Sequence, residues 1–219
     1  MSFIGLLFEI IKHIHLTDIG RNIMKKISAL LVAALMGMAG VEYNRLIFLG
    51  KITPVLATWL LLSLTSAIGI WTYFKSEGIK RDAITNIANT VDVISSWSIL
   101  LFLVFFGQKI RYTFTPFEVF CVGTSVVILL YWKISRKAKI ANFAINALLV
   151  IGYLPTIVGL YNSTINTEDF SFWIIVLTSR VVAFYNPIKE KDYLALLYAS
   201  RSAILAGVVL GLMIRIGLK

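Results

Sequence analysis

The sequence is poor in the residues that build most catalytic and metal centres. Its one cysteine, Cys121, excludes a disulfide framework, and we interpret it as a small apolar packing residue inside a hydrophobic segment. The only histidines, His13 and His15, are two positions apart and so fall on different faces of a helix. There is no His-Glu-x-x-His motif and no glycine-rich phosphate loop. We therefore expect no metal site, no cofactor and no enzymatic activity.

Charged residues are also scarce, at 15% of the chain, whereas hydrophobic residues reach 58% and the mean hydropathy is +0.85. Soluble domains are about 45–50% apolar and about 25% charged. The apolar residues here form blocks long enough to cross a hydrocarbon core of about 30 Å, which takes about 20 helical residues. They predict an all-α integral membrane protein with seven transmembrane helices, near residues 28–49, 55–74, 83–106, 114–132, 140–161, 171–187 and 193–216.

Residues 1–27, before the first block, mix apolar and basic side chains. The apolar stretch around Phe3 and Phe8 is too short to span a membrane, and no small-residue cleavage site follows it. We interpret this segment as an interfacial amphipathic helix, with a cleaved signal peptide as the alternative. The first span is the least regular, because Glu42 and Arg45 crowd its end and must lie at the outer interface if it crosses the membrane.

The net charge of +10 is distributed as a membrane topology would require, and it does not indicate a nucleic-acid partner. With seven spans, successive loops alternate between the two sides. The side of the N-terminus collects Lys12, Arg21, Lys25, Lys26, Lys75, Lys80, Arg81, Lys133, Arg136, Lys137, Lys139, Lys189 and Lys191, whereas the other side holds Lys51, Lys109, Arg111, Lys219 and, near span ends, Arg45 and Arg215. The positive-inside rule then predicts a cytoplasmic N-terminus and an outward C-terminus, in a bacterial or archaeal cytoplasmic membrane.

The second and sixth spans share an ordered pattern. Each has a tryptophan, the tripeptide Leu-Thr-Ser, a tyrosine and then an aspartate that opens the next span. The matching residues are Trp59, Leu64-Thr65-Ser66, Tyr73 and Asp82 in one copy, and Trp173, Leu177-Thr178-Ser179, Tyr185 and Asp192 in the other. A duplication would give parallel three-helix bundles at 28–106 and 140–219, joined by a linker helix within 107–139. The alternative is chance similarity between the aromatic-rich ends of membrane helices.

The second copy also resembles a known unit. Ile151-Gly-Tyr-Leu-Pro155-Thr156-Ile, followed by a short loop and Asn166-Thr-Glu-Asp-Phe-Ser-Phe-Trp173, resembles the PQ-loop superfamily, with Pro155-Thr156 in place of the signature Pro-Gln. The three-one-three order of spans resembles the SWEET sugar transporters and the nicotinamide-riboside transporters. The resemblance implies a small-solute transporter. It also leaves a receptor-like protein open, because the superfamily includes sorting receptors.

Polar and aromatic side chains recur at helical spacing inside several spans. Asn89, Asp92 and Ser96, for example, lie on one helical face. Because polar groups in hydrocarbon are costly, they usually face a bundle interior or a water-filled cavity. Together such faces could hydrogen-bond a small polar metabolite and stack a ring on tryptophan. The candidate substrate-binding residues are Trp59, Asn86, Asn89, Asp92, Asn142, Asn146, Tyr153, Trp173, Arg180 and Arg201.

Asp92 and Arg201 fall at nearly equivalent depths in the two proposed bundles. We expect them to approach each other, with Arg180 as the alternative partner of Asp92. Such a pair could fix helix packing, could break and re-form during transport, or could couple transport to protons through Asp92.

The polar residues and glycines of the spans also have purely structural interpretations. Membrane helices use Asn and Ser to hydrogen-bond one another, at about 1 kcal/mol each. Gly207 and Gly211 in the last span, like Gly37 and Gly40 in the first, have spacings typical of close helix packing.

Two function classes follow. The first is a transporter that works by alternating access between the two three-helix halves, with the lipid bilayer and a small-molecule substrate as partners. The second is a non-transporting membrane protein, such as a receptor-like or accessory subunit, whose polar residues serve assembly. A homo-oligomer is compatible with either class. A cavity lined by the candidate residues would favour the first class, and a dry, fully packed bundle the second.

Overall fold

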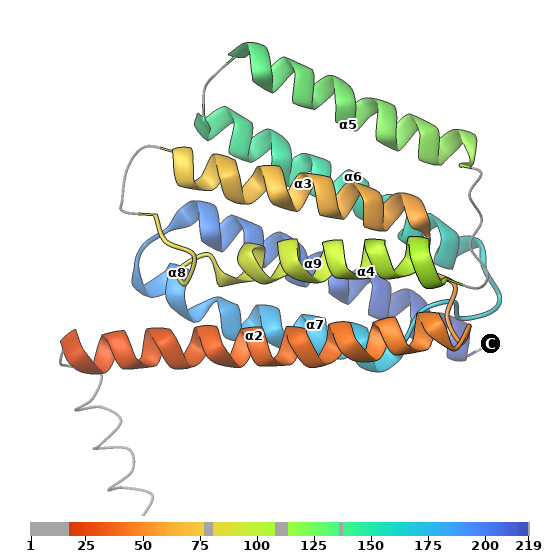
Figure 1. The fold of residues 1–219 in the computed structure, drawn as a ribbon, viewed down its shortest axis with the longest axis horizontal. Helices are drawn as coiled ribbons and strands as arrows, with labels where there is room; N and C mark the ends of the chain where they lie inside the picture. The colour runs from red at the N-terminus through yellow and green to blue at the C-terminus, as the bar shows by residue number, and fades with distance from the viewer. Residues whose placement is uncertain (1–17, 77–80, 108–113, 136–137, 219) are drawn as a thin grey trace, which may run out of the picture.

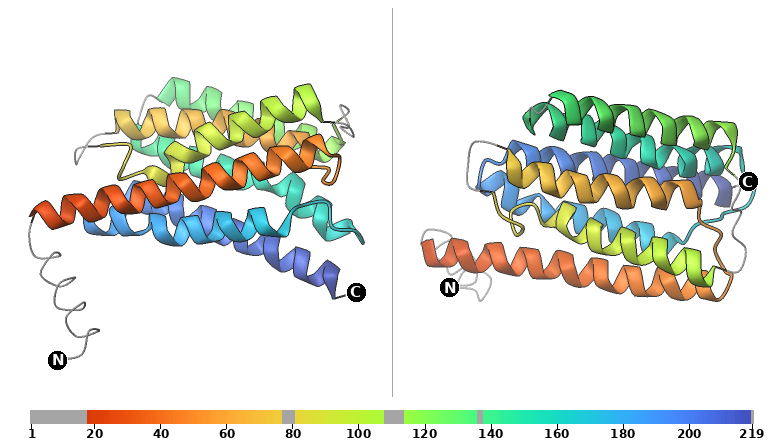
Figure 2. Two further views of the ribbon diagram at one scale, coloured as in Figure 1. Left: turned by 60° about the horizontal axis from the view of Figure 1, so that its bottom comes forward. Right: turned by 45° about the horizontal axis from the view of Figure 1, so that its top comes forward.

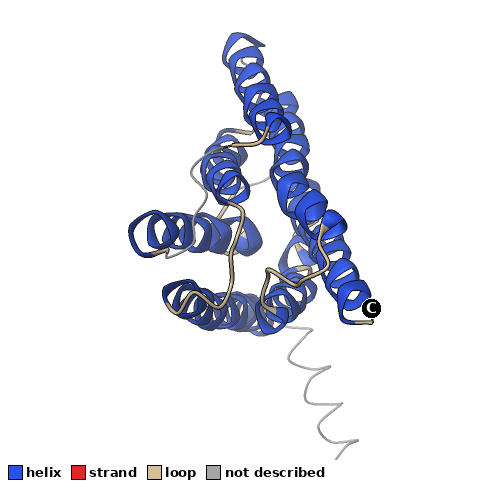
Figure 3. Cartoon of the chain, turned by 90° about the vertical axis from the view of Figure 1, so that its right-hand side faces the viewer, coloured by secondary structure: helices blue, strands red, loops and turns tan. Residues whose placement is uncertain are grey.

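The computed structural model describes residues 18–76, 81–107, 114–135 and 138–218, and no strand occurs in these ranges (Figure 3). The helices lie side by side and run back and forth along a common axis (Figures 1 and 2). They are α2 (Asp18–Phe48), α3 (Leu56–Lys75), α4 (Ile87–Phe106), α5 (Pro116–Ser135), α6 (Ala138–Asn162), α7 (Phe170–Ala183), α8 (Tyr185–Lys189) and α9 (Tyr193–Gly217).

Six helical segments are long and apolar enough to cross a membrane. They are Gly20–Phe48, Leu56–Lys75, Ile87–Phe106, Phe143–Asn162, Phe170–Lys189 and Tyr193–Gly217. The expectation of an all-helical, multi-pass architecture is confirmed at this level. α5, a helix of 20 residues, coincides with the remaining predicted span.

The first helix is longer than the predicted span. α2 begins at Asp18, so that residues 18–27, which we assigned to the interfacial segment, continue the same helix. No proline interrupts this stretch, and Lys25 is fixed by an ion pair of 3.0 Å with Asp82. Residues 1–17 lie outside the described residues.

The far end of α2 carries its charges in an exposed pair. Arg45 donates from Nε and Nη2 to the two carboxylate oxygens of Glu42, at 2.7 Å each. The helix ends at Phe48, and the positive φ of 62° at Gly50 lets Lys51 N donate back to Leu46 O at 3.0 Å. The crowded end of the first span is therefore a capped helix end whose two charges pair with each other.

The helices pack in two similar sets of three. We call α2, α3 and α4 the first triplet, and α6, α7 and α9 the second triplet. α4 packs against both α2 and α3, as α9 packs against both α6 and α7. Between the triplets, α2 lies against α7 and α3 against α6, while α5 lies at the edge of the bundle beside α6 (Figures 1 and 2).

Two glycines lie where the triplets approach each other closely. A Cβ at Gly69 would lie 3.2 Å from Ile145 Cγ2, and one at Gly152 would lie 3.3 Å from Leu61 Cβ. By contrast, a Cβ at Gly37, Gly40, Gly207 or Gly211 would meet no atom of the described chain within 4 Å. Our assignment of those four glycines to close packing is therefore wrong for contacts within the described chain.

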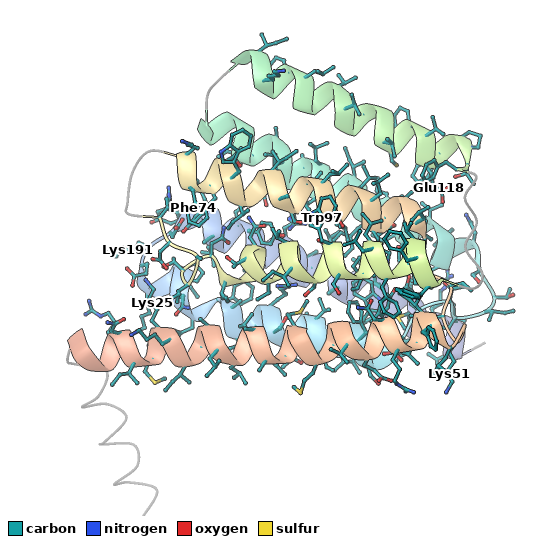
Figure 4. The ribbon with its side chains drawn as sticks, viewed as in Figure 1. Lys25, Lys51, Phe74, Trp97, Glu118 and Lys191 are labelled. Carbon is teal, nitrogen blue, oxygen red and sulfur yellow. The ribbon has the colours of Figure 1, made fainter. Side chains whose placement is uncertain are left out.

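Four charged residues mark the two ends of the bundle. Lys25 and Lys191 lie at one end, and Lys51 and Glu118 at the opposite end (Figure 4). We call these the Lys25 end and the Lys51 end.

Candidate functional site

A small cavity lies between the triplets, with walls from α2, α3, α4, α6, α7 and α9. Its volume of about 30 Å³ leaves room for no more than a few water molecules. We call it the central cavity. Six of the candidate residues line it, namely Trp59, Asp92, Tyr153, Trp173, Arg180 and Arg201, together with Met36, Leu62, Ser66, Ser95, Ser96, Ile99, Leu149, Phe172, Val176 and Tyr198.

The central ion pair of this cavity joins Asp92 on α4 to Arg180 on α7. Arg180 Nη2 donates to Asp92 Oδ1, and Arg180 Nη1 donates to Ala88 O at 3.2 Å. Tyr198 Oη donates to the second carboxylate oxygen, Asp92 Oδ2, at 2.8 Å. Arg180 is 1% exposed and the Asp92 side chain 18% exposed, so this is a largely buried ion pair, and each carboxylate oxygen accepts a hydrogen bond.

Arg201 does not pair with Asp92, contrary to our first choice. Arg201 Nε donates to Asn146 Oδ1 at 3.3 Å, and its guanidinium lies over the ring of Tyr198, 4.6 Å from the centroid. The Tyr198 side chain therefore lies against Arg201 with its ring and bonds to Asp92 with its hydroxyl. Arg180, named above as the alternative, is the partner of Asp92.

None of the candidate asparagines whose side chains the structure describes lines the cavity. Asn89 abuts Gly69 and, with its nitrogen turned toward α3, donates to Ser66 O and Tyr198 Oη at 3.2 Å each. Asn86 is buried at the start of α4, and Asn146 bonds to Arg201. The side chain of Asn142 lies outside the described residues. Within the described chain the asparagines thus serve helix contacts and the positioning of cavity residues.

Aromatic rings cover the Lys51 side of the cavity. Phe172 lies 5.3 Å from Trp173 and 6.0 Å from Trp59 between ring centroids, and Tyr153 lies 5.9 Å from Trp173. Tyr43 packs on the same group, 4.2 Å from Phe172. The two tryptophans of the repeated pattern therefore meet in one cluster, contributed by both triplets.

Glu168 lies beyond these rings, in the loop before α7. It is 5% exposed, and its Oε2 accepts hydrogen bonds from Tyr43 Oη at 2.6 Å and Trp173 Nε1 at 3.2 Å. Burial raises the pKa of Glu168 to about 7, although these two hydrogen bonds oppose the rise. Nearby, Thr53 N donates to Thr167 O at 3.1 Å and ties the two loops of this end together.

A polar cluster closes the Lys25 end. Asp192, buried at the start of α9, accepts from Tyr73 Oη at 2.7 Å and from Arg81 Nη1 at 2.5 Å. The same carboxylate caps α9 by accepting from Leu194 N and Ala195 N. One side chain therefore connects the end of α3, the loop after it and the start of α9.

The other aspartate of the repeated pattern, Asp82, lies at the same end but does not open a helix as predicted, because α4 begins at Ile87. Asp82 accepts from Thr85 N and Thr85 Oγ1 at 2.8 Å each, and from Lys25 Nζ at 3.0 Å. Burial would raise the pKa of Asp82, but the hydrogen bonds from Lys25 and Thr85 outweigh it and hold that pKa below its usual range. Lys25 also reaches Glu190 at 3.4 Å, so that all three meet at this end.

Sequence reasoning missed Tyr198 and Glu168. Tyr198 is three residues before Arg201 and shares its helical face, so the spacing alone could have placed it at the site. Glu168 lies in a loop, where no periodicity distinguishes a buried carboxylate from a solvated one.

The described residues contain no group of three His, Cys, Asp or Glu side chains arranged to hold a metal ion. The chain matches no protein-family model, no curated protein and no solved structure. The resemblance to the PQ-loop superfamily thus stays a prediction.

Proposed function

We propose that this chain is a small-solute membrane transporter that works by alternating access between its two triplets. The observation that carries the proposal is the central cavity, which places the Asp92–Arg180 pair and the tryptophans of both triplets around one space. Transport by this route needs a polar site between two bodies that can rock against each other. The two triplets supply the bodies.

The packing order supports a duplicated unit. In each triplet the third helix contacts the other two, and the contacts between triplets are exchanged in a two-fold manner, α2 with α7 and α3 with α6. In this proposal α5 is the seventh crossing and the linker, which restores the orientation of the second triplet. The two triplets then form parallel bundles related by an axis along the membrane normal.

Closures on both sides of the cavity support alternating access. At the Lys51 end the cavity is covered by rings and by Glu168, and at the Lys25 end Asp192 ties α3 to α9. Opening one closure while the other stays intact would expose the cavity to one side only. We assign the Lys25 end, with Lys25 and Lys191, to the cytoplasm of a bacterial or archaeal cell.

The small volume of the cavity favours a second candidate. A space of about 30 Å³ surrounded by paired polar groups also suits a packed, non-transporting membrane protein, such as a receptor-like or accessory subunit. This alternative predicts that no solute crosses the membrane through the protein.

Uptake into proteoliposomes tests the proposal. We expect at least one solute, from a panel of sugars, nucleosides and vitamins, to accumulate above the level in protein-free liposomes. The double variant Asp92→Asn/Arg180→Gln should lose this uptake. The control Glu42→Gln/Arg45→Gln, which removes an exposed ion pair, should keep it. Equal uptake with and without protein across the panel would contradict the transporter proposal.

A further inference from the structure

The charges of the central cavity do not balance. Its lining contains two guanidinium groups, Arg180 and Arg201, and one carboxylate, Asp92. Both oxygens of Asp92 are occupied, one by Arg180 and the other by Tyr198. One positive charge, that of Arg201, is therefore left over in the cavity wall.

Arg201 is buried without a counter-ion. It is 8% exposed, and it forms no ion pair with any described residue. Its contacts are the neutral oxygen of Asn146 and the ring of Tyr198, and its Nη1 has no hydrogen-bond partner in the described chain. An unpaired charge inside a membrane protein is costly and marks a functional group by default.

Arg201 also lies well inside the helix that carries it. It is the ninth residue of α9, so its Cα lies roughly 12 Å along the helix from the Tyr193 end, at a rise of 1.5 Å per residue. Arg215, near the other end of the same helix, has a partner of its own, since it donates to Tyr161 O at 2.7 Å. Arg201 instead holds its charge beside the cavity, where a ligand can neutralise it.

We propose that Arg201 is the anion-binding residue of the central cavity, and that the ligand is a small organic carboxylate. Guanidinium binds a carboxylate through parallel hydrogen bonds, and Nη1 is free to make one of them. The rings of Trp59, Phe172 and Trp173 provide apolar surfaces for the rest of the molecule. This inference rests on the proposed function, because the ligand fits only when the triplets separate and enlarge the cavity.

Pairs of a carboxylate and its neutral amide test whether the negative charge of the ligand contributes to binding. The purified full-length protein is titrated in detergent with benzoate and with benzamide, its neutral isostere, and binding is followed by the rise in melting temperature. Acetate and acetamide form a second pair without a ring. We expect benzoate to bind about tenfold or more tightly than benzamide, as the gain of a charge-assisted hydrogen bond implies.

Variants locate the effect at Arg201. Arg201→Gln should abolish the preference for benzoate, whereas Arg201→Lys, which keeps the charge, should retain part of it. The control Arg215→Gln removes an arginine of the same helix that does not line the cavity, and it should bind as the wild type does. Without ligand, Arg201→Gln should melt at a higher temperature than the wild type, because it relieves an unpaired charge. A purely structural arginine would give a lower melting temperature.

The outcomes separate this inference from the proposed function. If no carboxylate stabilises the wild type, or if Arg201→Gln keeps the preference for benzoate, the assignment of Arg201 is overturned even when a neutral solute is transported. If benzoate binds through Arg201 but no solute crosses proteoliposomes, the anion site stands and the transporter proposal fails.

Discussion

The Arg180 guanidinium on α7 pairs with the Asp92 carboxylate on α4, so that a buried ion pair bridges the two triplets beside the central cavity. The two residues are 88 positions apart in the chain. A pair in this place can serve stability, transport or both. The two roles respond differently to single and double substitution.

Removal of one partner should destabilise the protein strongly. Arg180→Gln leaves Asp92 with Tyr198 alone, and Asp92→Asn leaves Arg180 charged and buried. Breaking a buried pair in this way costs about 3–5 kcal/mol, while replacing both partners costs less. We expect Asp92→Asn/Arg180→Gln to melt, in detergent, at a higher temperature than either single variant.

Uptake separates the two roles of this pair. If the double variant is stable but inactive, the pair belongs to the transport machinery. If it is stable and transports at the wild-type rate, the pair only fixes helix packing. A double variant as unstable as the two single effects added together would contradict the idea that the residues act as a pair.

The raised pKa of Glu168 predicts that the stability of the protein falls as the pH rises. Its folded-state pKa, about 7, lies above the ordinary value of 4.5, so that the folded protein favours the protonated form. The stabilisation is complete below about pH 4.5 and is lost as the pH rises through about 7. The difference corresponds to about 3 kcal/mol. Melting temperature measured in detergent from pH 4.5 to pH 8 should therefore decline across this window.

Substitutions isolate this carboxyl group. Glu168→Gln should flatten the decline and should be more stable than the wild type at pH 8, because the amide keeps an oxygen for Tyr43 and Trp173. Glu42→Gln, at an exposed carboxylate of the same end, should leave the decline unchanged. A decline that persists in Glu168→Gln would show that another group causes it.

Periodicity predicted which side chains face inward, but not which of them meet. Asp92, Arg180 and Arg201 all lie on polar faces, and all three line the cavity. Which arginine pairs with Asp92 depends on the rotation and offset of α7 and α9 relative to α4, which spacing within one helix does not determine. The asparagines show the same limit, because Asn89 faces a backbone contact with α3 at Gly69 instead of the cavity.

Hydrophobic blocks gave reliable span positions and less reliable ends. The block near 193–216 corresponds closely to α9, which Asp192 caps at a definite residue. α2 instead begins at Asp18, because a polar stretch continues a helix wherever neighbours such as Asp82 hold it. Hydropathy detects the passage through hydrocarbon and does not detect the helix beyond it.

The two capping aspartates of the second triplet offer a matched comparison. Asp169 caps α7 through one hydrogen bond from Phe172 N, whereas Asp192 caps α9 and also binds Tyr73 and Arg81. Asp169→Ala should cost about 1 kcal/mol. Asp192→Ala should cost about 3 kcal/mol or more, because it also breaks a buried ion pair. Equal losses in melting temperature would mean that the Tyr73 and Arg81 bonds contribute nothing.

The contact between α3 and α6 should resist even one added methyl group. A Cβ at Gly152 would lie 3.3 Å from Leu61 Cβ, which is fixed to the backbone and yields only if the helices move apart. We expect Gly152→Ala to lower stability by about 1–3 kcal/mol. Gly207→Ala, in open space on α9, should instead raise it by up to about 1 kcal/mol through helix propensity. Opposite signs in the two changes of melting temperature would separate close packing between the triplets from a general intolerance of helix glycines to substitution.

If the triplets rock about this contact, Gly152→Ala should also reduce proteoliposome uptake at temperatures where the variant remains folded, whereas Gly207→Ala should not.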